Sequence, residues 1–158
     1  MSSPADDWRP AADWEVLEAR AAMLERLRRD FNMAGFLEVE TPLLSSDVCV
    51  DEHIDPFVVS GLDDDELFLQ TSPEFAMKRL VADSARSIFQ VTRAFRRDEF
   101  GTQHNPEFTI VEWYVPGSTY LNQMDLVEHL VRSVAEVAPR CPPWMERPTS
   151  GEPFGRLS

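Results

Sequence analysis

The sequence contains only two cysteines, Cys49 and Cys141, which are isolated from each other. Two such thiols do not make a disulfide framework, and they lack the spacing of a zinc site. We therefore expect neither a disulfide nor a metal held by cysteine, and we assign no function to either thiol.

Long hydrophobic runs are also missing. No stretch approaches the roughly 20 apolar residues that a membrane span needs, and the N-terminus lacks the basic and then apolar pattern of a signal peptide. We therefore expect a cytoplasmic protein without a membrane partner. The 158 residues, 43% of them hydrophobic, are enough for one domain with a single core.

Basic residues are scarce, since the net charge is −13, and none lies between Asp30 and Met77. An acidic chain does not offer the broad basic surface of a nucleic-acid-binding protein. The basic residues that follow are clustered, which favours a small anionic ligand, although a chance cluster on a merely soluble acidic surface is the alternative. The cluster consists of Lys78, Arg79, Arg86, Arg93, Arg96 and Arg97.

Periodicity predicts an α+β protein. Apolar residues at helical spacing predict helices over 13–34 and 121–138, with Asp13 and Asn122 as N-caps. A third helix is expected to begin with Ser72 as N-cap and Pro73 at the first helical position. Short strands are expected at 36–39, before Pro42 ends regular pairing, and at 57–59, 66–70 and 87–92, and a longer one at 107–114. Tails are expected over 1–12 and 139–158.

The last two predicted strands enclose an unusually polar loop. Residues 93–114 read RAFRRDEFGTQHNPEFTIVEWY, and Phe108, Ile110, Glu112 and Tyr114 share one face of the second strand. An arginine offers a planar fork for phosphate or carboxylate oxygens, and an aromatic side chain can stack on a base. The residues alone leave two interpretations open: a nucleotide-handling hairpin, or a solvated hairpin with a charged tip.

The order of these residues resembles motif 2 of the class II aminoacyl-tRNA synthetases. The string FRRDE followed by HNPEFT and EWY is similar to the lysine branch, and most similar to the elongation factor P β-lysine ligase family, a paralogue of lysyl-tRNA synthetase. The helix and strand that end at Pro42 resemble motif 1, and the string TSPE resembles the amino-acid-binding loop of the ligase family. The resemblance covers residues 13–138.

The resemblance implies an ATP-dependent ligase that activates lysine or β-lysine as an adenylate. Catalysis would rest on Arg96, which would contact the α-phosphate and the substrate carboxylate. The amino acid would be bound by Ser72, Pro73, Glu74 and Tyr114. The ATP site would consist of Arg96, Arg97, Asp98, His104, Asn105 and Phe108.

The resemblance also implies partners and a fold. The acceptor would be a lysine side chain of elongation factor P, with tRNA less favoured, and motif 1 would form a homodimer. The implied fold is a class II synthetase-like antiparallel sheet flanked by helices, with a tail over 1–12, the catalytic core over 13–138 and an irregular tail or truncated continuation over 139–158.

Two departures qualify this interpretation. The family usually has FRNEE where this chain has Phe95-Arg96-Arg97-Asp98-Glu99, so that a shorter acid would face adenine. Motif 3, with a second ATP-binding arginine and the acids that hold Mg²⁺, has no counterpart here. We therefore expect the front half of a catalytic domain. A truncated lysyl-tRNA synthetase, a non-catalytic nucleotide-binding or dimerising relative, and an unrelated α+β domain are the alternatives.

Overall fold

The computed structural model describes residues 10, 12–61, 65–138 and 154–155. The predicted tails over 1–12 and 139–158, Cys141, and Asp63 and Asp64 of an acidic run lie largely or wholly outside these residues. The described residues form two compact units, one within the ranges 1–30 and 119–158 and one within 31–118. In the described residues, no helix has the length and apolar character needed to cross a membrane.

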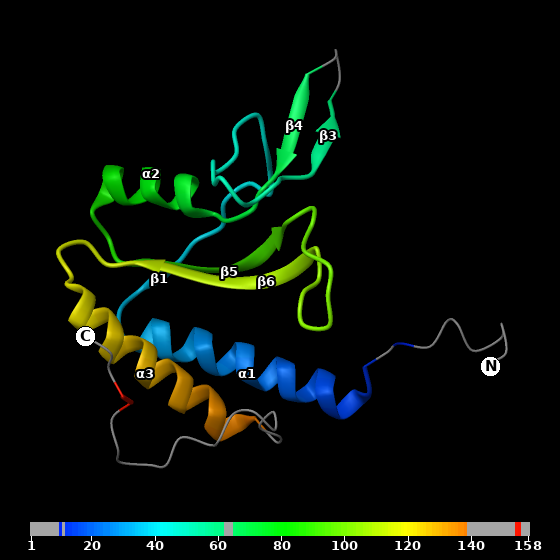
Figure 1. Cartoon of the computed structure of the whole chain (residues 1–158). Coiled ribbons are helices and arrows are strands. Elements are labelled where there is room, and N and C mark those ends of the chain that lie inside the picture. The colour runs from blue at the N-terminus through cyan, green and yellow to red at the C-terminus, as the bar shows by residue number, and fades with distance from the viewer. Residues whose placement is uncertain (1–9, 11, 62–64, 139–153, 156–158) are drawn as a thin grey trace, which may run out of the picture. The chain divides into compact units, whose positions relative to one another are not determined.

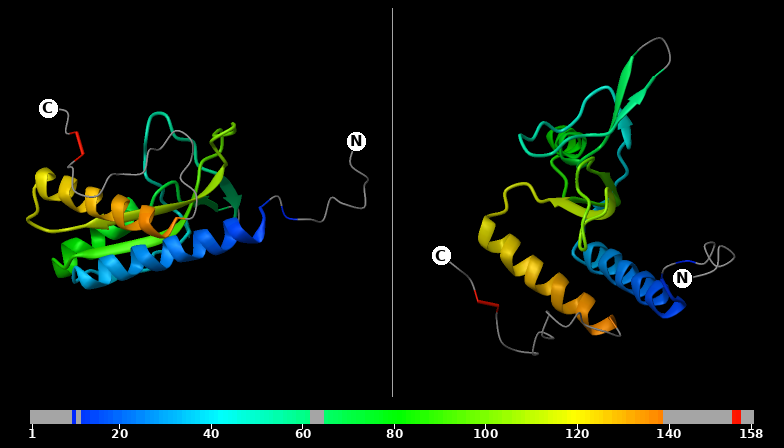
Figure 2. Two further views of the ribbon diagram at one scale, coloured as in Figure 1. Left: turned by 90° about the horizontal axis from the view of Figure 1, so that it is seen from below. Right: turned by 45° about the vertical axis from the view of Figure 1, so that its right-hand side comes forward.

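The first unit consists of two helices, α1 (Trp14–Met33), up to Asp30, and α3 (Tyr120–Val137). They run side by side in opposite directions (Figure 1; Figure 2). Asp30, only 8% exposed, accepts hydrogen bonds from Arg26 and from the buried hydroxyl of Ser133. Arg26 also pairs with Glu136 at 3.3 Å. A buried carboxylate needs such partners, and here they join the two helices.

The predicted extents of both helices are confirmed, but one of the two predicted caps is wrong. Asp13 Oδ1 accepts from the backbone N–H of Val16 at 2.9 Å, as an N-cap does. In α3 the cap is Thr119 rather than Asn122. Asn122 lies three residues further on, and its side chain accepts from the Thr119 N–H in a reciprocal capping box.

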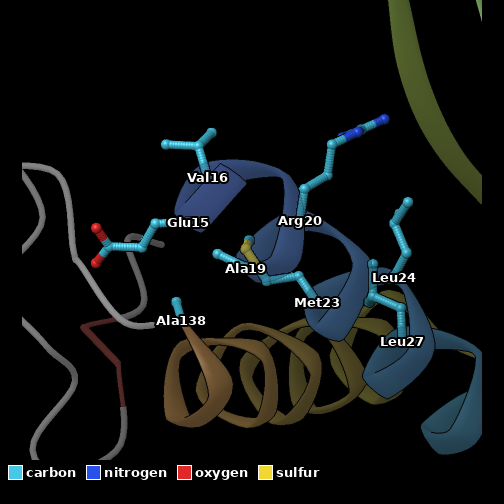
Figure 3. A pocket seen from close by; sticks show the side chains of 8 residues that line it. All are labelled: Glu15, Val16, Ala19, Arg20, Met23, Leu24, Leu27 and Ala138. Carbon is cyan, nitrogen blue, oxygen red and sulfur yellow. The ribbon is translucent and has the colours of Figure 1, made fainter. Parts of the chain in front are cut away.

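The apolar stripe of α1 is only partly covered. Together with Ala138, it lines an open pocket of about 400 Å³ (Figure 3). Val16 remains 53% exposed, and Arg20 and Leu24 point away from α3 in Figure 3. The pocket is apolar and lies in a different unit from the residues predicted to bind a ligand. Its lining is Glu15, Val16, Ala19, Arg20, Met23, Leu24, Leu27 and Ala138.

The second unit contains two three-stranded sheets. The larger has the order β1-β5-β6, with β1 (Leu37–Glu38), β5 (Ile88–Phe95) and β6 (Glu107–Tyr114). The antiparallel hairpin of β5 and β6 confirms the prediction, with Ile88 opposite Tyr114 and Phe95 opposite Glu107. The expected antiparallel sheet is confirmed for β5 and β6, whereas β1 pairs with β5 in parallel, so that the sheet is mixed. A long connection that includes the second sheet and a helix lets the chain return in the same direction.

The core of this unit is aromatic. Phe31, at the end of α1, is fully buried and stacks on Phe89 with ring centroids 4.5 Å apart. Phe36 packs edge-on to Phe31 at 5.1 Å, and Trp113 lies at 5.5 Å. The turn after α1 brings Phe36 back, because Gly35 has a φ of +83° and the Phe36 N–H bonds to the Phe31 carbonyl.

The smaller sheet is antiparallel, with the order β2-β4-β3: β2 (Leu44–Ser45), β3 (Val58–Ser60) and β4 (Glu66–Leu69). Gln70 follows β4 and connects this sheet to the hairpin. Its side chain donates to the Arg93 carbonyl at 2.7 Å, and its own carbonyl accepts from the Phe95 N–H at 2.9 Å. The buried side chain of Gln70 therefore holds the chain that follows β4 against β5.

The next segment is helix α2 (Glu74–Ser84), which packs near β6. It begins one residue later than predicted, because Pro73, not Ser72, is the N-cap. Proline lacks an N–H, so it suits this position, and the Ser72 hydroxyl still accepts from the Glu74 N–H at 3.1 Å. Glu74 thus lies in the first turn, fixed at its backbone.

Helix α2 ends at Ala85, which has a φ of +49°. This left-handed conformation is unfavourable for a residue with a Cβ atom and is usual for glycine. We expect Ala85→Gly to raise the free energy of unfolding by about 0.5–1 kcal/mol, after the greater entropy of unfolded glycine is subtracted. Urea denaturation would measure the change. A loss of stability would show that the conformation at Ala85 carries no strain. Ser84→Gly, inside the helix, is the matched control and should destabilise.

Candidate functional site

The two faces of the β5–β6 hairpin have different characters. Trp113 shares one face with Phe89, its partner across the hairpin, and this face joins the aromatic core. The opposite face carries Phe108, Glu112 and Tyr114 along β6. At about 3.4 Å per residue, Phe108 and Glu112 are roughly 14 Å apart on this face. The predicted nucleotide and amino-acid residues therefore lie at two ends of one strand face.

We name the end of this strand face at Glu112 the amine end, after the predicted amino-acid ligand. Its central group is the carboxylate of Glu112. Ser72 Oγ donates to Glu112 Oε2 at 2.7 Å, and the Tyr114 hydroxyl donates to Glu112 Oε1 at 2.7 Å. Each carboxylate oxygen therefore accepts from one hydroxyl, which fixes the group in place. Ser72 comes from the start of α2 and the other two residues from β6.

Glu74 supplies a second carboxylate to this end. Its Oε1 is bonded to Lys78 Nζ at 2.5 Å, one helical turn further on, and its Oε2 lies 4.0 Å from the thiol of Cys49. The structure thus brings together three of the four predicted amino-acid-binding residues, Ser72, Glu74 and Tyr114. The fourth, Pro73, is buried at the start of α2 and supports the turn.

The charges at this end alter three pKa values. Burial, and then the hydrogen bond to Glu112, raises the pKa of Tyr114 far above its ordinary value. Burial and then Glu74 raise the pKa of the Cys49 thiol, which therefore stays protonated at neutral pH. The hydrogen bond to Glu74 raises the pKa of Lys78. The amine end thus holds two carboxylates, one ammonium and three neutral donors, the hydroxyls of Ser72 and Tyr114 and the thiol of Cys49.

The raised pKa of Tyr114 predicts a dependence of stability on pH. The folded protein holds the phenol proton more tightly than the unfolded chain, whose pKa is near 10.0. The stabilisation is therefore complete below pH 10 and is lost as the pH rises above it. Above pH 10, the free energy of unfolding should fall less steeply with pH in Tyr114→Phe than in the parent chain. The two slopes should differ by an amount that corresponds to at most one proton per molecule. Denaturation at several pH values tests this, and equal slopes would contradict it.

The anion end of the site is formed by Arg96 and Phe108. The guanidinium of Arg96 lies over the Phe108 ring, 5.0 Å from its centroid, and the Arg96 N–H donates to the Pro106 carbonyl at 2.9 Å. Arg96 Nη1 pairs with Glu99 Oε1 at 3.2 Å. Arg96 Nε is shielded from solvent and has no hydrogen-bond partner among the described residues. An N–H that is shielded from water and has no hydrogen-bond partner lowers the stability of the fold. An anion that accepts this hydrogen bond would remove that cost, so the position suits an anion.

The other predicted nucleotide-binding residues are more peripheral. Arg97 is half exposed and is 3.5 Å from both Asp55 and Asp98. Asp98 is itself exposed and makes that contact from the turn after β5. His104 and Asn105 are exposed in the hairpin loop, where the backbone of His104 bonds to that of Gly101. The structure does not bring these four side chains to Arg96, and their roles remain predictions.

Sequence reasoning missed Glu112 and Glu99 as members of the site. Glu112 had a visible signal, because a carboxylate shares a strand face with Phe108 and Tyr114. Glu99 had none, since its contact with Arg96 depends on the turn after β5. Gln90, which pairs with Glu112 across the hairpin, is a further polar residue at this end: it is only 2% exposed and accepts from Thr41 Oγ1 at 3.0 Å.

Metal binding finds no support in these residues. In the part of the chain that the structure describes, no group of three His, Cys, Asp or Glu side chains could hold an ion. Glu74 and Glu112 already use their oxygens for Lys78, Ser72 and Tyr114. The described residues therefore do not fit a protein-held Mg²⁺.

Curated relatives match most of the chain. Elongation factor P–(R)-beta-lysine ligase of Pseudoalteromonas translucida is 44% identical over 140 residues, which are 84% of this chain and 42% of that protein. The protein of the same name from Erwinia tasmaniensis is 42% identical over 147 residues, or 88% of this chain and 44% of its own length. The chain thus spans less than half the length of these relatives.

The family comparison covers a longer segment. The family described as tRNA synthetases class II (D, K and N) matches residues 6–158. This match includes both ends of the strand face described above. The chain belongs to the class II tRNA synthetases of the D, K and N group.

Proposed function

We propose that this chain supplies the lysine-binding and ATP-binding side of an amino-acid ligase that modifies elongation factor P. The observation that carries the proposal is the division of one face of β6 into an amine end and an anion end. Glu112, fixed by two hydroxyls, lies at one, and Arg96 over Phe108 lies at the other. The names of the relatives contain elongation factor P and (R)-β-lysine, which supports elongation factor P as the acceptor and a lysine-like amino acid as the substrate.

The amine end suits an ammonium group. Glu112 is held as a hydrogen-bond acceptor by Ser72 and Tyr114, and Glu74, whose charge is partly offset by Lys78, adds a second carboxylate. In a partly desolvated site a carboxylate attracts an ammonium more strongly than in water. The side chain of lysine or β-lysine would place its ammonium here, with its carboxylate directed towards Arg96.

The anion end suits ATP. Phe108 would stack on adenine, and Arg96 would hold the α-phosphate beside the substrate carboxylate. A carboxylate oxygen would then form a bond to the α-phosphorus while the bond to the β-phosphate oxygen breaks, releasing pyrophosphate. No side-chain nucleophile is needed, because the barrier falls through positioning and charge stabilisation. In this proposal Mg²⁺ accompanies the triphosphate.

The second half-reaction would transfer the acyl group. The amine of an elongation factor P lysine would attack the acyl carbon, form an amide, lose a proton to solvent and displace AMP. We further propose a cytoplasmic homodimer through α1. Its exposed apolar residues Val16 and Leu17, and the pocket beside them, support that proposal.

The test is exchange of labelled pyrophosphate into ATP by the chain, with lysine, (R)-β-lysine or leucine added. Exchange with lysine or β-lysine, but not with leucine, is the expected result. To identify the acceptor, elongation factor P or tRNA would be added with ATP and the labelled amino acid, and the label on each would be measured. Charging of tRNA without labelling of elongation factor P would overturn the proposed acceptor. Absence of exchange, with no thermal stabilisation by ATP and lysine, would overturn the activity.

A further inference from the structure

The contact between Arg96 and Glu99 places a negative group where the proposed function requires an anionic ligand. Glu99 Oε1 lies 3.2 Å from Arg96 Nη1, and the two side chains are 33% and 25% exposed. Both are therefore partly shielded, and Arg96 Nε is shielded completely. An incoming phosphate that uses this guanidinium meets the carboxylate first.

Glu99 is the described carboxylate that offsets the positive charge of Arg96. The Phe108 ring occupies one face of the guanidinium at 5.0 Å. The neighbouring acids have other partners, since Asp98 pairs with Arg97 and Glu107 pairs with Arg93, each at 3.5 Å. Glu99 is thus the described carboxylate that contacts Arg96, three residues away across the turn that follows β5.

We propose that Glu99 sets the anion affinity of the site: it contacts Nη1 of Arg96 in the unliganded site and competes there with oxyanion ligands. A ligand with several negative charges displaces it, whereas a singly charged carboxylate gains little by exchange. This inference rests on the proposed function, which it deepens, because it names the group that a triphosphate must displace from Arg96. It assigns Glu99 no contact with the reacting atoms.

The experiment measures binding of inorganic tripolyphosphate, ATP and acetate to the chain and three variants. Glu99→Gln removes the competing charge and should bind tripolyphosphate about fivefold more tightly, the factor for about 1 kcal/mol from a partly exposed pair. Acetate must displace the same contact, so its affinity should rise by a similar factor. Glu107→Gln, in the same hairpin but paired with Arg93, makes the same change of charge and should leave binding within twofold.

Glu99→Asp separates contact from charge. It keeps the negative charge but shortens the side chain by one methylene, so it should behave like Glu99→Gln if contact with Arg96 matters. Behaviour like the parent chain would overturn the inference. A second readout needs no ligand: phenylglyoxal should label Arg96 faster in Glu99→Gln, as peptide mass spectrometry would show.

Each outcome decides the question. Tighter tripolyphosphate binding in the two Glu99 variants alone supports the inference. If ATP binds no better than tripolyphosphate, that result counts against the proposed function and leaves the inference supported. Equal effects of Glu99→Gln and Glu107→Gln would show a general charge effect and overturn it. Weaker binding in Glu99→Gln would show that Glu99 orients Arg96, and no anion binding by any variant would also overturn it.

Discussion

Replacing Phe31 with alanine is expected to lower the free energy of unfolding by about 3–5 kcal/mol. Phe31 is fully buried, stacks on Phe89 at 4.5 Å, and contacts Phe36 and Trp113 edge-on or tilted. Alanine would remove the apolar area and leave a cavity that three rings cannot close. Because small proteins are stable by only about 5–15 kcal/mol, this is a large fraction of the total.

Chemical denaturation followed by tryptophan fluorescence would measure the loss. Phe75→Ala is the matched control, because the same atoms are removed from a side chain that is 48% exposed on α2. We expect it to cost less than about 1 kcal/mol. Similar losses in the two variants would show that the aromatic cluster is not the core of this unit.

Replacing Glu112 with glutamine is expected to weaken lysine binding by about tenfold to a hundredfold, since hydrogen bonds to charged groups contribute about 1.5–3 kcal/mol. Glutamine has nearly the same shape but no charge. Its amide nitrogen is also a donor, so it cannot accept from both Ser72 and Tyr114 as the carboxylate does. The amine end would lose its charge and its fixed geometry together.

Isothermal titration with lysine and, separately, with ATP would test this prediction. ATP affinity should stay within about twofold, because Glu112 lies roughly 14 Å along β6 from Phe108. Glu107→Gln, at the exposed end of the same strand, should leave lysine binding unchanged. Loss of ATP and lysine binding together would point to local unfolding of the hairpin, and unchanged lysine binding would remove Glu112 from the amine end.

The long, periodic elements could be predicted from the sequence. Strand 107–114 was predicted to the residue because its alternation is strict, and α1 was bounded by Asp13 and Gly35. The parallel pairing of β1 with β5 could not be predicted, because two paired residues of β1 carry no signal of direction. The cap of α3 was misplaced because Thr119 and Asn122 are both good caps, and only geometry shows which one precedes the first turn.

The site was predictable where a residue's role follows from its position on a strand or helix. Arg96 and Phe108 meet because they lie near the two ends of one hairpin loop. Ser72 and Glu74 lie near Tyr114 because α2 begins beside β6. Contacts that depend on a turn were not predictable. The pairing of Arg97 with Asp55 is one example, since the partners lie far apart in sequence and meet only at the surface.

The spacing of the strand pairs along the chain has a consequence for folding. Phe95 pairs with Glu107 across a short loop, whereas Leu37 must find Ile88 across most of the second unit. Hairpins form within about 1–10 μs, and distant pairings are slower because a long loop must close first. Arg96 and Phe108 therefore come together early. Ser72 and Glu112 meet only after the start of α2 has docked on β6, so amide hydrogen exchange in β5 and β6 should report the first protected structure of this unit.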